Sequence, residues 1–318
     1  MKILVTGAAG FIGSHLCDEL LAKGHHVVGM DNFFRGKREN IPSNKNFKFY
    51  NIDLSSKGAL IESIFNEEKP EIVFHYAAIN GTKYFYDMPY DVLNQNIKIT
   101  QNVLNACKTP HVRKVIYASS SEVYGNDPPT PTPEDHNILL NVNTDRDSYA
   151  SSKALGDFYV KQFCKSNDKS YIILRIFNTY GPRMDTSEYG QVIPEFIRKA
   201  KVEKEFTIIG SGKHTRTFCY VDDHVQLVSK LLEGADNKII NVGGEVEVTI
   251  LELAKIVNKL ANKEFNPTFT ADREYDTLHR RPDITKLIKH TGKHDFVDLS
   301  EGVKKTMDWF QDKIRGIK

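Results

Sequence analysis

The stretch KILVTGAAGFIG, residues 2–13, decides the fold of this chain of 318 residues. A run of apolar and β-branched residues leads directly into a loop with Gly7, Gly10 and Gly13, and a segment with helical character begins at Phe11. Glycines at this spacing allow a tight turn, let the backbone approach a pyrophosphate, and let the helix pack closely on the strand. The stretch therefore predicts a strand, a phosphate-binding loop and a helix of a dinucleotide-binding fold.

The rest of the first half repeats this alternation of strand and helix. The pattern predicts strands at 2–6, 26–30, 47–51, 72–76, 114–118 and 170–176, and helices at 11–23, 57–68, 90–108 and 149–166. The strands are continuous apolar runs, which is typical of buried parallel strands. We therefore expect an α/β fold of the Rossmann type, with a doubly wound parallel sheet.

The pattern becomes less regular after Asn178. Helices are expected at 191–201, from about Thr249 and at 300–313, with a short strand at 206–209 and a charged loop at 272–283. We expect residues 1–178 to form the dinucleotide-binding domain, with return segments near residues 214–242. Residues 179–318 are expected to form mainly a smaller, interleaved substrate-binding lobe.

Two acidic residues bear on the choice of nucleotide. Asp31 directly follows the second predicted strand, where a carboxylate can accept hydrogen bonds from both ribose hydroxyls of adenosine and would repel a 2′-phosphate. This favours NAD over NADP, although Arg35 is a contrary sign because an arginine can accommodate that phosphate. Asp53, after the third strand, is either an acceptor for the adenine amino group or a solvated loop residue.

Composition excludes several other classes of protein. The net charge of +2 comes from scattered basic residues and gives no long-range attraction to nucleic acid or to an anionic membrane. The four cysteines lie far apart and are expected to be reduced core thiols. The eleven histidines form no metal-binding motif, so no metal is expected. No apolar run resembles a signal peptide or a membrane span, so we expect a cytoplasmic protein.

Tyr149 and Lys153 occupy positions i and i+4 of a predicted helix and so share one face. A phenolate beside a nicotinamide can take a proton from an alcohol while hydride leaves its carbon. A free phenol ionises near pH ~10, so use near neutrality needs a shift of about 3 units, or about 4 kcal/mol. The Lys153 ammonium and the positive ring of an oxidised nicotinamide are the expected sources of that shift.

The serine-rich stretch 118–125, ASSSEVYG, begins at the carboxyl end of a predicted strand, where open α/β sheets bind ligands. The Ser120 hydroxyl can hydrogen-bond the substrate oxygen that loses its proton, and Glu122 can act on a neighbouring carbon. A purely structural role does not readily explain why the chain carries, in this order, a glycine loop, Ser120, Tyr149 and Lys153.

Eight stretches, spread nearly from end to end, together resemble the extended short-chain dehydrogenase/reductases of the nucleotide-sugar epimerase/dehydratase family. They are TGAAGFIG from Thr6, DNFFRG from Asp31, FHYAA from Phe74, SSSEVYG from Ser119, YASSK from Tyr149, RIFNTYGPRM from Arg175, GSGKHTRTF from Gly210 and HRRPDI from His279. The resemblance implies NAD as cofactor, a nucleotide-diphosphate sugar as substrate, and a homodimer that packs through helices 90–108 and 149–166.

The resemblance also implies roles for individual residues. Catalysis falls to Ser120, Glu122, Tyr149 and Lys153. Cofactor contacts are expected, besides Tyr149 and Lys153, from Gly7, Gly10, Phe11, Ile12, Gly13, Asp31, Asn32, Arg35, Asp53, Leu54, Tyr76, Ala77 and Ala78. Substrate contacts are expected from Thr82, Lys83, Ser121, Asn178, Arg183, Val192, Arg216 and Arg280, with the Asn178, Arg216 and Arg280 side chains at the diphosphate.

The implied first step is oxidation at sugar C4, and several fates of the 4-keto sugar stay open. Epimerisation at C4 is favoured because it requires least of the pocket. Decarboxylation, 4,6-dehydration and release of the 4-keto sugar are the alternatives: second-half motifs are close to UDP-glucuronate decarboxylases, but YASSK departs from their usual YDEGK. The segment Tyr84, Phe85 and Tyr86 also departs from the common epimerase and decarboxylase sequences, which favours an unusual sugar or release of the ketone.

A non-catalytic protein that binds NAD as a sensor is the alternative from another functional class.

Overall fold

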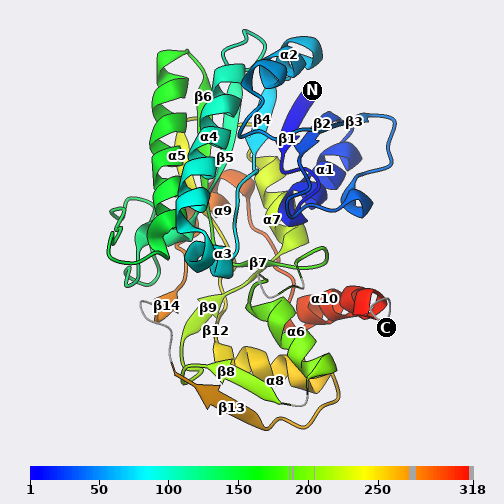
Figure 1. Cartoon of the computed structure of the whole chain (residues 1–318), viewed down its shortest axis with the longest axis vertical. Coiled ribbons are helices and arrows are strands. Elements are labelled where there is room, and N and C mark those ends of the chain that lie inside the picture. The colour runs from blue at the N-terminus through cyan, green and yellow to red at the C-terminus, as the bar shows by residue number, and fades with distance from the viewer. Residues whose placement is uncertain (186, 188–189, 204, 272–276, 315–318) are drawn as a thin grey trace.

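The computed structural model describes residues 1–185, 187, 190–203, 205–271 and 277–314 (Figure 1). Its main sheet has seven parallel strands in the order β11-β6-β5-β4-β1-β2-β3. The strand bounds are β1 Lys2–Thr6, β2 His26–Asp31, β3 Phe47–Asn51, β4 Ile72–His75, β5 Lys114–Ser120, β6 Ser170–Ile176 and β11 Lys238–Val242. The order reverses direction beside β1, so the sheet is doubly wound, and the predicted fold class is confirmed.

Helices cover both faces of this sheet (Figure 1). On one face, α2 Gly58–Glu68, α4 Pro89–Ala106 and α5 Asp147–Ser166 share a buried apolar cluster with the strands. On the other face, α1 Phe11–Ala22 packs beside α7 Val221–Lys230 over a second cluster. The sheet is therefore buried between two helical layers, as its apolar strands require.

Most of the remaining elements lie below the carboxyl ends of the strands in Figure 1, whereas the helix at residues 285–291 packs beside β11 and α7. The remaining elements are η1 Arg38–Asn40, α3 Thr82–Asp87, η2 Ser121–Tyr124, β7 Thr179–Tyr180, α6 Val192–Val202, β8 Phe206–Ile209, β9 Thr215–Thr217, β10 Cys219–Tyr220, β12 Glu247–Thr249, α8 Ile250–Leu260, β13 Pro267–Thr270, β14 His279–Arg280, α9 Thr285–Thr291 and α10 Leu299–Ile314. The apolar side chains of α6 and α8 belong to the same buried cluster as those of α1 and α7.

Most of the predicted elements are present with small differences at their ends. Strand β4 ends at His75 rather than at 76, because the Tyr76 and Ala77 N–H groups donate to the Thr6 hydroxyl (3.1 and 3.0 Å). Helices α3 and α7 and strand β11 were not predicted as elements. The loop expected at 272–283 lies partly outside the described residues, and its end forms β14, which pairs with β9.

All four cysteines are buried and unpaired, in agreement with the predicted core thiols. Among the helices that the structure describes, none combines the length and the apolar character needed to cross a membrane.

Candidate active site

One large cavity opens at the carboxyl ends of the central strands, and every residue predicted for the site lines it. The cavity extends from the glycine loop and Asp31 to Arg216 on β9 and Arg280 on β14. The sequence therefore brought all of its predicted site residues to one cavity, although the contacts that their side chains make differ from those expected at several positions.

The glycine loop has the shape of a phosphate cradle. Gly7 has a φ of +72°, and the Gly7 and Ala8 N–H groups both donate to the Met30 carbonyl oxygen (2.8 and 3.2 Å). A Cβ atom added at Gly13 would lie 2.0 Å from the Gly7 carbonyl oxygen, so α1 can approach β1 this closely only with glycine there. Such a loop at a helix N-terminus fits the pyrophosphate of a dinucleotide.

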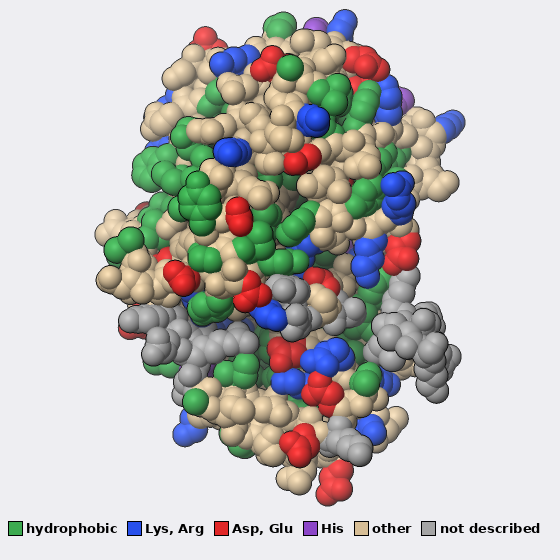
Figure 2. Space-filling model, in the orientation of Figure 1, with side chains coloured by type: hydrophobic (Ala, Val, Ile, Leu, Met, Phe, Trp, Pro, Cys, Tyr) green, Lys and Arg blue, Asp and Glu red, His purple; other side chains and the backbone are tan. Residues whose placement is uncertain are grey.

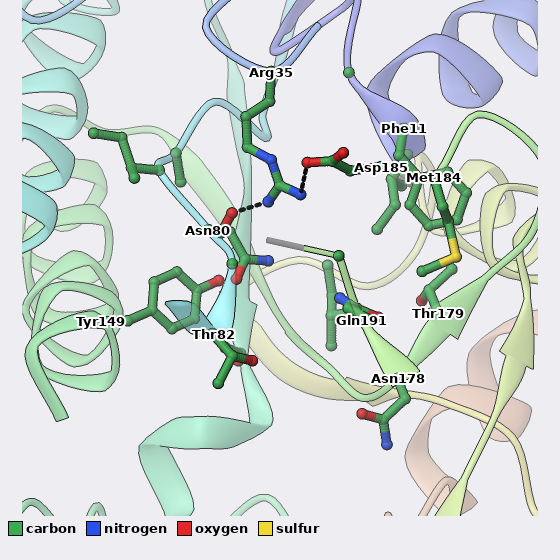
Figure 3. A pocket seen from close by; sticks show the side chains of 18 of the residues that line it. Phe11, Arg35, Asn80, Thr82, Tyr149, Asn178, Thr179, Met184, Asp185 and Gln191 are labelled. Carbon is green, nitrogen blue, oxygen red and sulfur yellow. Dashed lines mark hydrogen bonds and ion pairs between the residues drawn. The ribbon is translucent and has the colours of Figure 1, made fainter. Parts of the chain in front are cut away.

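Asp31 is buried at the end of β2 and accepts hydrogen bonds from the Ala9 and Phe33 N–H groups (3.0 and 2.7 Å). Burial raises its pKa, and the backbone hydrogen bonds oppose this. Arg35 forms an ion pair with Asp185 (2.8 Å) and donates to the Asn80 carbonyl oxygen (Figure 3). Because the Arg35 guanidinium is engaged by these partners, the site fits a ribose 2′-hydroxyl, as in NAD, better than a 2′-phosphate.

Asp53 lines the cavity, and two neighbouring serines hold its carboxylate. Its Oδ1 accepts from the Ser55 N–H and hydroxyl (2.9 and 2.8 Å), and its Oδ2 accepts from the Ser56 hydroxyl (3.2 Å). These bonds leave lone pairs on Oδ2, so Asp53 fits both an acceptor for the adenine amino group and a solvated loop residue.

Tyr149 and Lys153 are both buried on α5, and Figure 3 shows Tyr149 pointing into the cavity. The Lys153 ammonium lies 5.7 Å from the centre of the Tyr149 ring and donates to the Ala118 carbonyl oxygen (2.7 Å). Burial lowers the pKa of Lys153 to about 8, and the neighbouring Asp157 opposes this shift.

The phenol is not made more acidic by the protein groups alone. Burial raises the pKa of Tyr149 above its ordinary value, and the charge of Glu122 adds to this effect. A hydrogen bond with Ser120 and the charge of Arg35 oppose it without overcoming it. The expectation that Lys153 holds the phenol partly ionised is therefore not met by the chain's own groups, because desolvation outweighs them.

Glu122 binds two arginines. Arg280 places both terminal nitrogens on its carboxylate, one of them at 3.3 Å, and Arg146 lies 3.5 Å away. Burial alone would raise the pKa of Glu122, but the two guanidiniums lower it to about 2. Arg280, expected at the diphosphate, is thus engaged with Glu122 and with the Thr277 hydroxyl (2.7 Å). Sequence reasoning missed Arg146, although its place three residues before Tyr149 was a usable signal.

Other predicted substrate contacts are also engaged with protein groups. The Arg183 guanidinium binds Asp18 (2.8 Å), Arg216 donates to the Thr215 carbonyl oxygen (2.8 Å), and the Asn178 amide donates to the Thr217 carbonyl oxygen (3.1 Å). The remaining predicted substrate residues, Thr82, Lys83, Ser121 and Val192, line the cavity.

An aromatic contact to Tyr149 was also missed. Phe85 on α3 stacks on the Tyr149 ring with 4.7 Å between ring centres and 11° between ring planes. The sequence marked residues 84–86 as unusual but gave no sign of this contact, because residues 64 positions apart meet only through the tertiary fold.

In the part of the chain that the structure describes, no cluster of three or more His, Cys, Asp or Glu side chains could hold a metal ion. The site instead combines a phosphate cradle, a carboxylate for ribose and a buried tyrosine–lysine pair. This arrangement defines the class of Rossmann-fold enzymes that use a nicotinamide dinucleotide.

Comparison with known proteins gives the particular family. The chain belongs to the NAD dependent epimerase/dehydratase family, whose match spans residues 3–243. It is 34% identical to a UDP-N-acetyl-alpha-D-glucosaminuronate decarboxylase of Bacillus cytotoxicus, over 98% of each protein.

Solved structures are similarly close. UDP-glucose 4-epimerase of Thermotoga maritima, with UDP-glucose, has a TM-score of 0.91 and 31% identity, over 99% of this chain and 100% of that one. UDP-glucuronic acid 4-epimerase of Bacillus cereus, in complex with UDP-glucuronic acid and NAD, has a TM-score of 0.88 and 30% identity, over 98% of this chain and 100% of that one. The predicted family, enzyme class and NAD cofactor are confirmed.

Proposed function

We propose that this enzyme oxidises C4 of a nucleotide-diphosphate sugar and re-reduces the ketone from the other face, which makes it a 4-epimerase. One observation carries the proposal: Ser120, Tyr149 and Lys153 line the same cavity as the glycine cradle, so a sugar alcohol and a nicotinamide can meet there. The names of the relatives, all nucleotide-sugar enzymes, support the substrate class.

The chain's residues handle the proton of the C4 hydroxyl. The glycine cradle and Asp31 would hold NAD, which would supply both the acceptor and the donor of hydride for this chemistry. Tyr149 takes the hydroxyl proton in the oxidation and gives it back in the reduction, so the overall reaction needs no net proton. Ser120 donates a hydrogen bond to the C4 oxygen. The Lys153 ammonium, together with the positive charge that bound NAD would add, favours the phenolate.

Dehydration is disfavoured by the state of Glu122. Loss of water across C5 and C6 needs a group that can protonate the leaving hydroxyl. The two guanidiniums on Glu122 hold its pKa at about 2, so its carboxylate is ionised at neutral pH and cannot be that acid. Epimerisation needs no acid at C6, which leaves it as the reaction with the fewest requirements.

Decarboxylation is the second candidate, and a specific observation favours it. Arg146 and Arg280 bring two positive charges to the one carboxylate of Glu122, so the sugar end of the cavity can accept another anion. A sugar carboxylate would be such an anion. Oxidation at C4 would make it a β-keto acid, which loses carbon dioxide readily, and a full-length relative is named as a decarboxylase.

The test offers UDP-glucose, UDP-glucuronate, UDP-N-acetylglucosamine and GDP-mannose to the NAD-loaded enzyme, with products identified by NMR. An inverted C4 supports epimerisation. Three other results would refute epimerisation: released carbon dioxide would indicate decarboxylation, a 4-keto-6-deoxy sugar would indicate dehydration, and stable NADH with a 4-keto sugar would indicate release of the ketone. A Tyr149→Phe variant should lose turnover; unchanged turnover would refute the catalytic assignment, and no reaction with any sugar would favour the NAD-binding sensor.

The enzyme is also proposed to form a homodimer through α4 and α5. Leu155, Phe158 and Tyr159 on α5 are exposed large apolar side chains, and Figure 2 shows hydrophobic side chains gathered near α3 and the lower parts of α4 and α5. Two copies of these helices would cover that surface. Sedimentation of the wild type as a dimer and of Phe158→Glu as a monomer would support this; a monomeric wild type at micromolar concentration would refute it.

We propose the cytoplasm as the location, supported by the four buried, unpaired cysteines. Fractionation of the native cells tests this, and recovery of the protein with an envelope fraction would contradict it.

A further inference from the structure

The ring of the proposed base is held by an aromatic partner that belongs to neither the cofactor cradle nor the substrate contacts predicted above. Phe85 and Tyr149 are both buried, with exposed fractions of 4% and 6%. Their rings are nearly parallel, at 11°, with centres 4.7 Å apart. Parallel, offset stacking at this distance is a favourable arrangement of two aromatic rings and is worth more than the burial of the same area.

We propose that Phe85 is a positioning residue: its ring holds the Tyr149 ring in the orientation that aims the phenolic oxygen at the sugar hydroxyl. The proposal rests on the proposed role of Tyr149 as the base. It concerns the efficiency of proton and hydride transfer, and it assigns Phe85 no contact with the reacting atoms.

The chemistry of phenylalanine suits this role. The terminal torsion of a tyrosine side chain is broad, so hydrogen bonds at the hydroxyl leave the ring plane poorly defined. Stacking acts on the ring face and defines the plane. An aromatic side chain at position 85 supplies such a ring face, and a leucine does not.

Further contacts make Phe85 rigid. Phe85, Tyr149, Ile79 and Val92 form one buried apolar cluster, with Tyr84 and Met88 packed against it. The cluster joins α3, the start of α4 and the loop after β4 to α5. A rigid support of this kind matters because transfer rates are sensitive to displacements of about 1 Å.

The same contact keeps water from the phenol. Burial is the largest cause of the raised pKa of Tyr149. The charged and titratable groups around the phenol come from β5, η2, α5 and the loop after β2, and they are Tyr117, Ser120, Glu122, Lys153 and Arg35. None of these groups is altered when Phe85 is replaced, so a change at 85 isolates the effect of stacking and desolvation.

The experiment compares Phe85→Leu, Phe85→Tyr and Phe85→Ala with wild type in single-turnover formation of bound NADH from a nucleotide sugar that the enzyme converts. Loss of the stack in Phe85→Leu should slow NADH formation by about 3- to 10-fold, while the KM for the sugar stays within about twofold. Phe85→Tyr keeps the stack and should restore the rate. If Phe85→Ala unfolds, the leucine and tyrosine variants still test the proposal.

A pH profile separates positioning from a purely structural role. Activity rises with pH as the base loses its proton, and admission of water lowers the pKa of the phenol. The acidic limb of kcat/KM should therefore move to lower pH in Phe85→Ala, or in Phe85→Leu if the alanine variant unfolds, and should stay in place in Phe85→Tyr. A matched control is Phe269→Leu, an exposed aromatic on β13, which should change neither rate nor profile.

Three outcomes would overturn the proposal. The first is an unchanged rate per folded molecule in Phe85→Leu. The second is a raised KM with unchanged kcat, which would make Phe85 a wall of the sugar site. The third is a Phe85→Tyr variant as slow as Phe85→Leu. Tyr149→Phe, measured in parallel, keeps the failures distinct: if it retains turnover, the proposed function fails, and if it loses turnover while the Phe85 variants do not, only the positioning role fails.

Discussion

Replacing Glu122 with glutamine should destabilise the enzyme through the two arginines that share its carboxylate. Arg280 and Arg146 have only 4% and 9% of their side chains exposed, and Glu122 has 23% exposed. Removing one partner from a buried ion pair leaves charges in a poorly solvating environment. The fall of the Glu122 pKa from 4.5 to about 2 corresponds to about 3 kcal/mol.

The size of this loss depends on pH in a definite direction. Because the folded-state pKa of Glu122 is depressed, its contribution is complete well above pH 4.5 and disappears as the pH falls toward 2. We expect Glu122→Gln to be less stable than wild type by about 3 kcal/mol at pH 7 and by only about 1 kcal/mol at pH 3. As the pH falls, the difference between the two proteins should therefore shrink.

Urea unfolding of both proteins at several pH values measures this difference. Glu67→Gln is a matched control, because Glu67 has 62% of its side chain exposed and pairs with an exposed lysine at 2.8 Å. That variant should differ from wild type by less than about 1 kcal/mol at every pH. A loss in Glu122→Gln that stays constant from pH 7 to pH 3 would contradict the electrostatic account.

Three further predictions concern the cofactor site and acid stability. Asp31→Ser should weaken NAD binding by about 10- to 100-fold and reduce the preference for NAD over NADP, because a charged acceptor for the ribose hydroxyls is lost. Calorimetric titration with both cofactors measures this, and an unchanged ratio of the two affinities would contradict the role of Asp31. Gly13→Ala should lower the free energy of unfolding by about 1 to 3 kcal/mol and reduce the NAD content of the purified enzyme, because the alanine Cβ would lie 2.0 Å from the Gly7 carbonyl oxygen. A variant with normal stability and normal NAD content would contradict the close packing of the glycine loop. Burial lowers the pKa values of His75 and His224 to about 3, so as the pH falls below 6.5 these histidines take up protons in the unfolded chain but not in the folded one. The free energy of unfolding should therefore fall by about 2 kcal/mol for each histidine between pH 7 and pH 5. Urea unfolding of His75→Gln at the two pH values should show a smaller fall than that of wild type.

Much of the fold could be read from local pattern. The strands at 2–6, 47–51 and 170–176 were predicted with the bounds that the structure has, because short runs of β-branched and aromatic residues favour strands, even in the partly exposed edge strand 47–51. Strand β11, KIINV, was missed although it is as long as β1, and its place in the sheet is defined by its pairing with β6. Helix α3 was missed because its six residues are too few to show a helical period.

The sequence predicted which residues line the cavity better than it predicted which side chains contact one another. Motif spacing placed Ser120, Glu122, Tyr149 and Lys153 at one cavity, because the carboxyl ends of parallel strands meet at one edge. Spacing could not say that Arg280 would bind Glu122, since these residues are 158 positions apart. The pKa values of Glu122 and Tyr149 depend on such distant neighbours and on burial.

The sequence by itself determined the doubly wound α/β fold, the glycine-rich loop and the place of Tyr149 and Lys153 on one helix face, because each depends on residues that lie close along the chain. Only the tertiary structure decided how these groups are tuned. Arg146 and Arg280 converge on Glu122, and Phe85 stacks on Tyr149, through contacts between separate elements. The physical reason is that charge pairing, stacking and desolvation depend on distances in space, and those distances exist only once the sheet, α3, α5 and β14 have packed together.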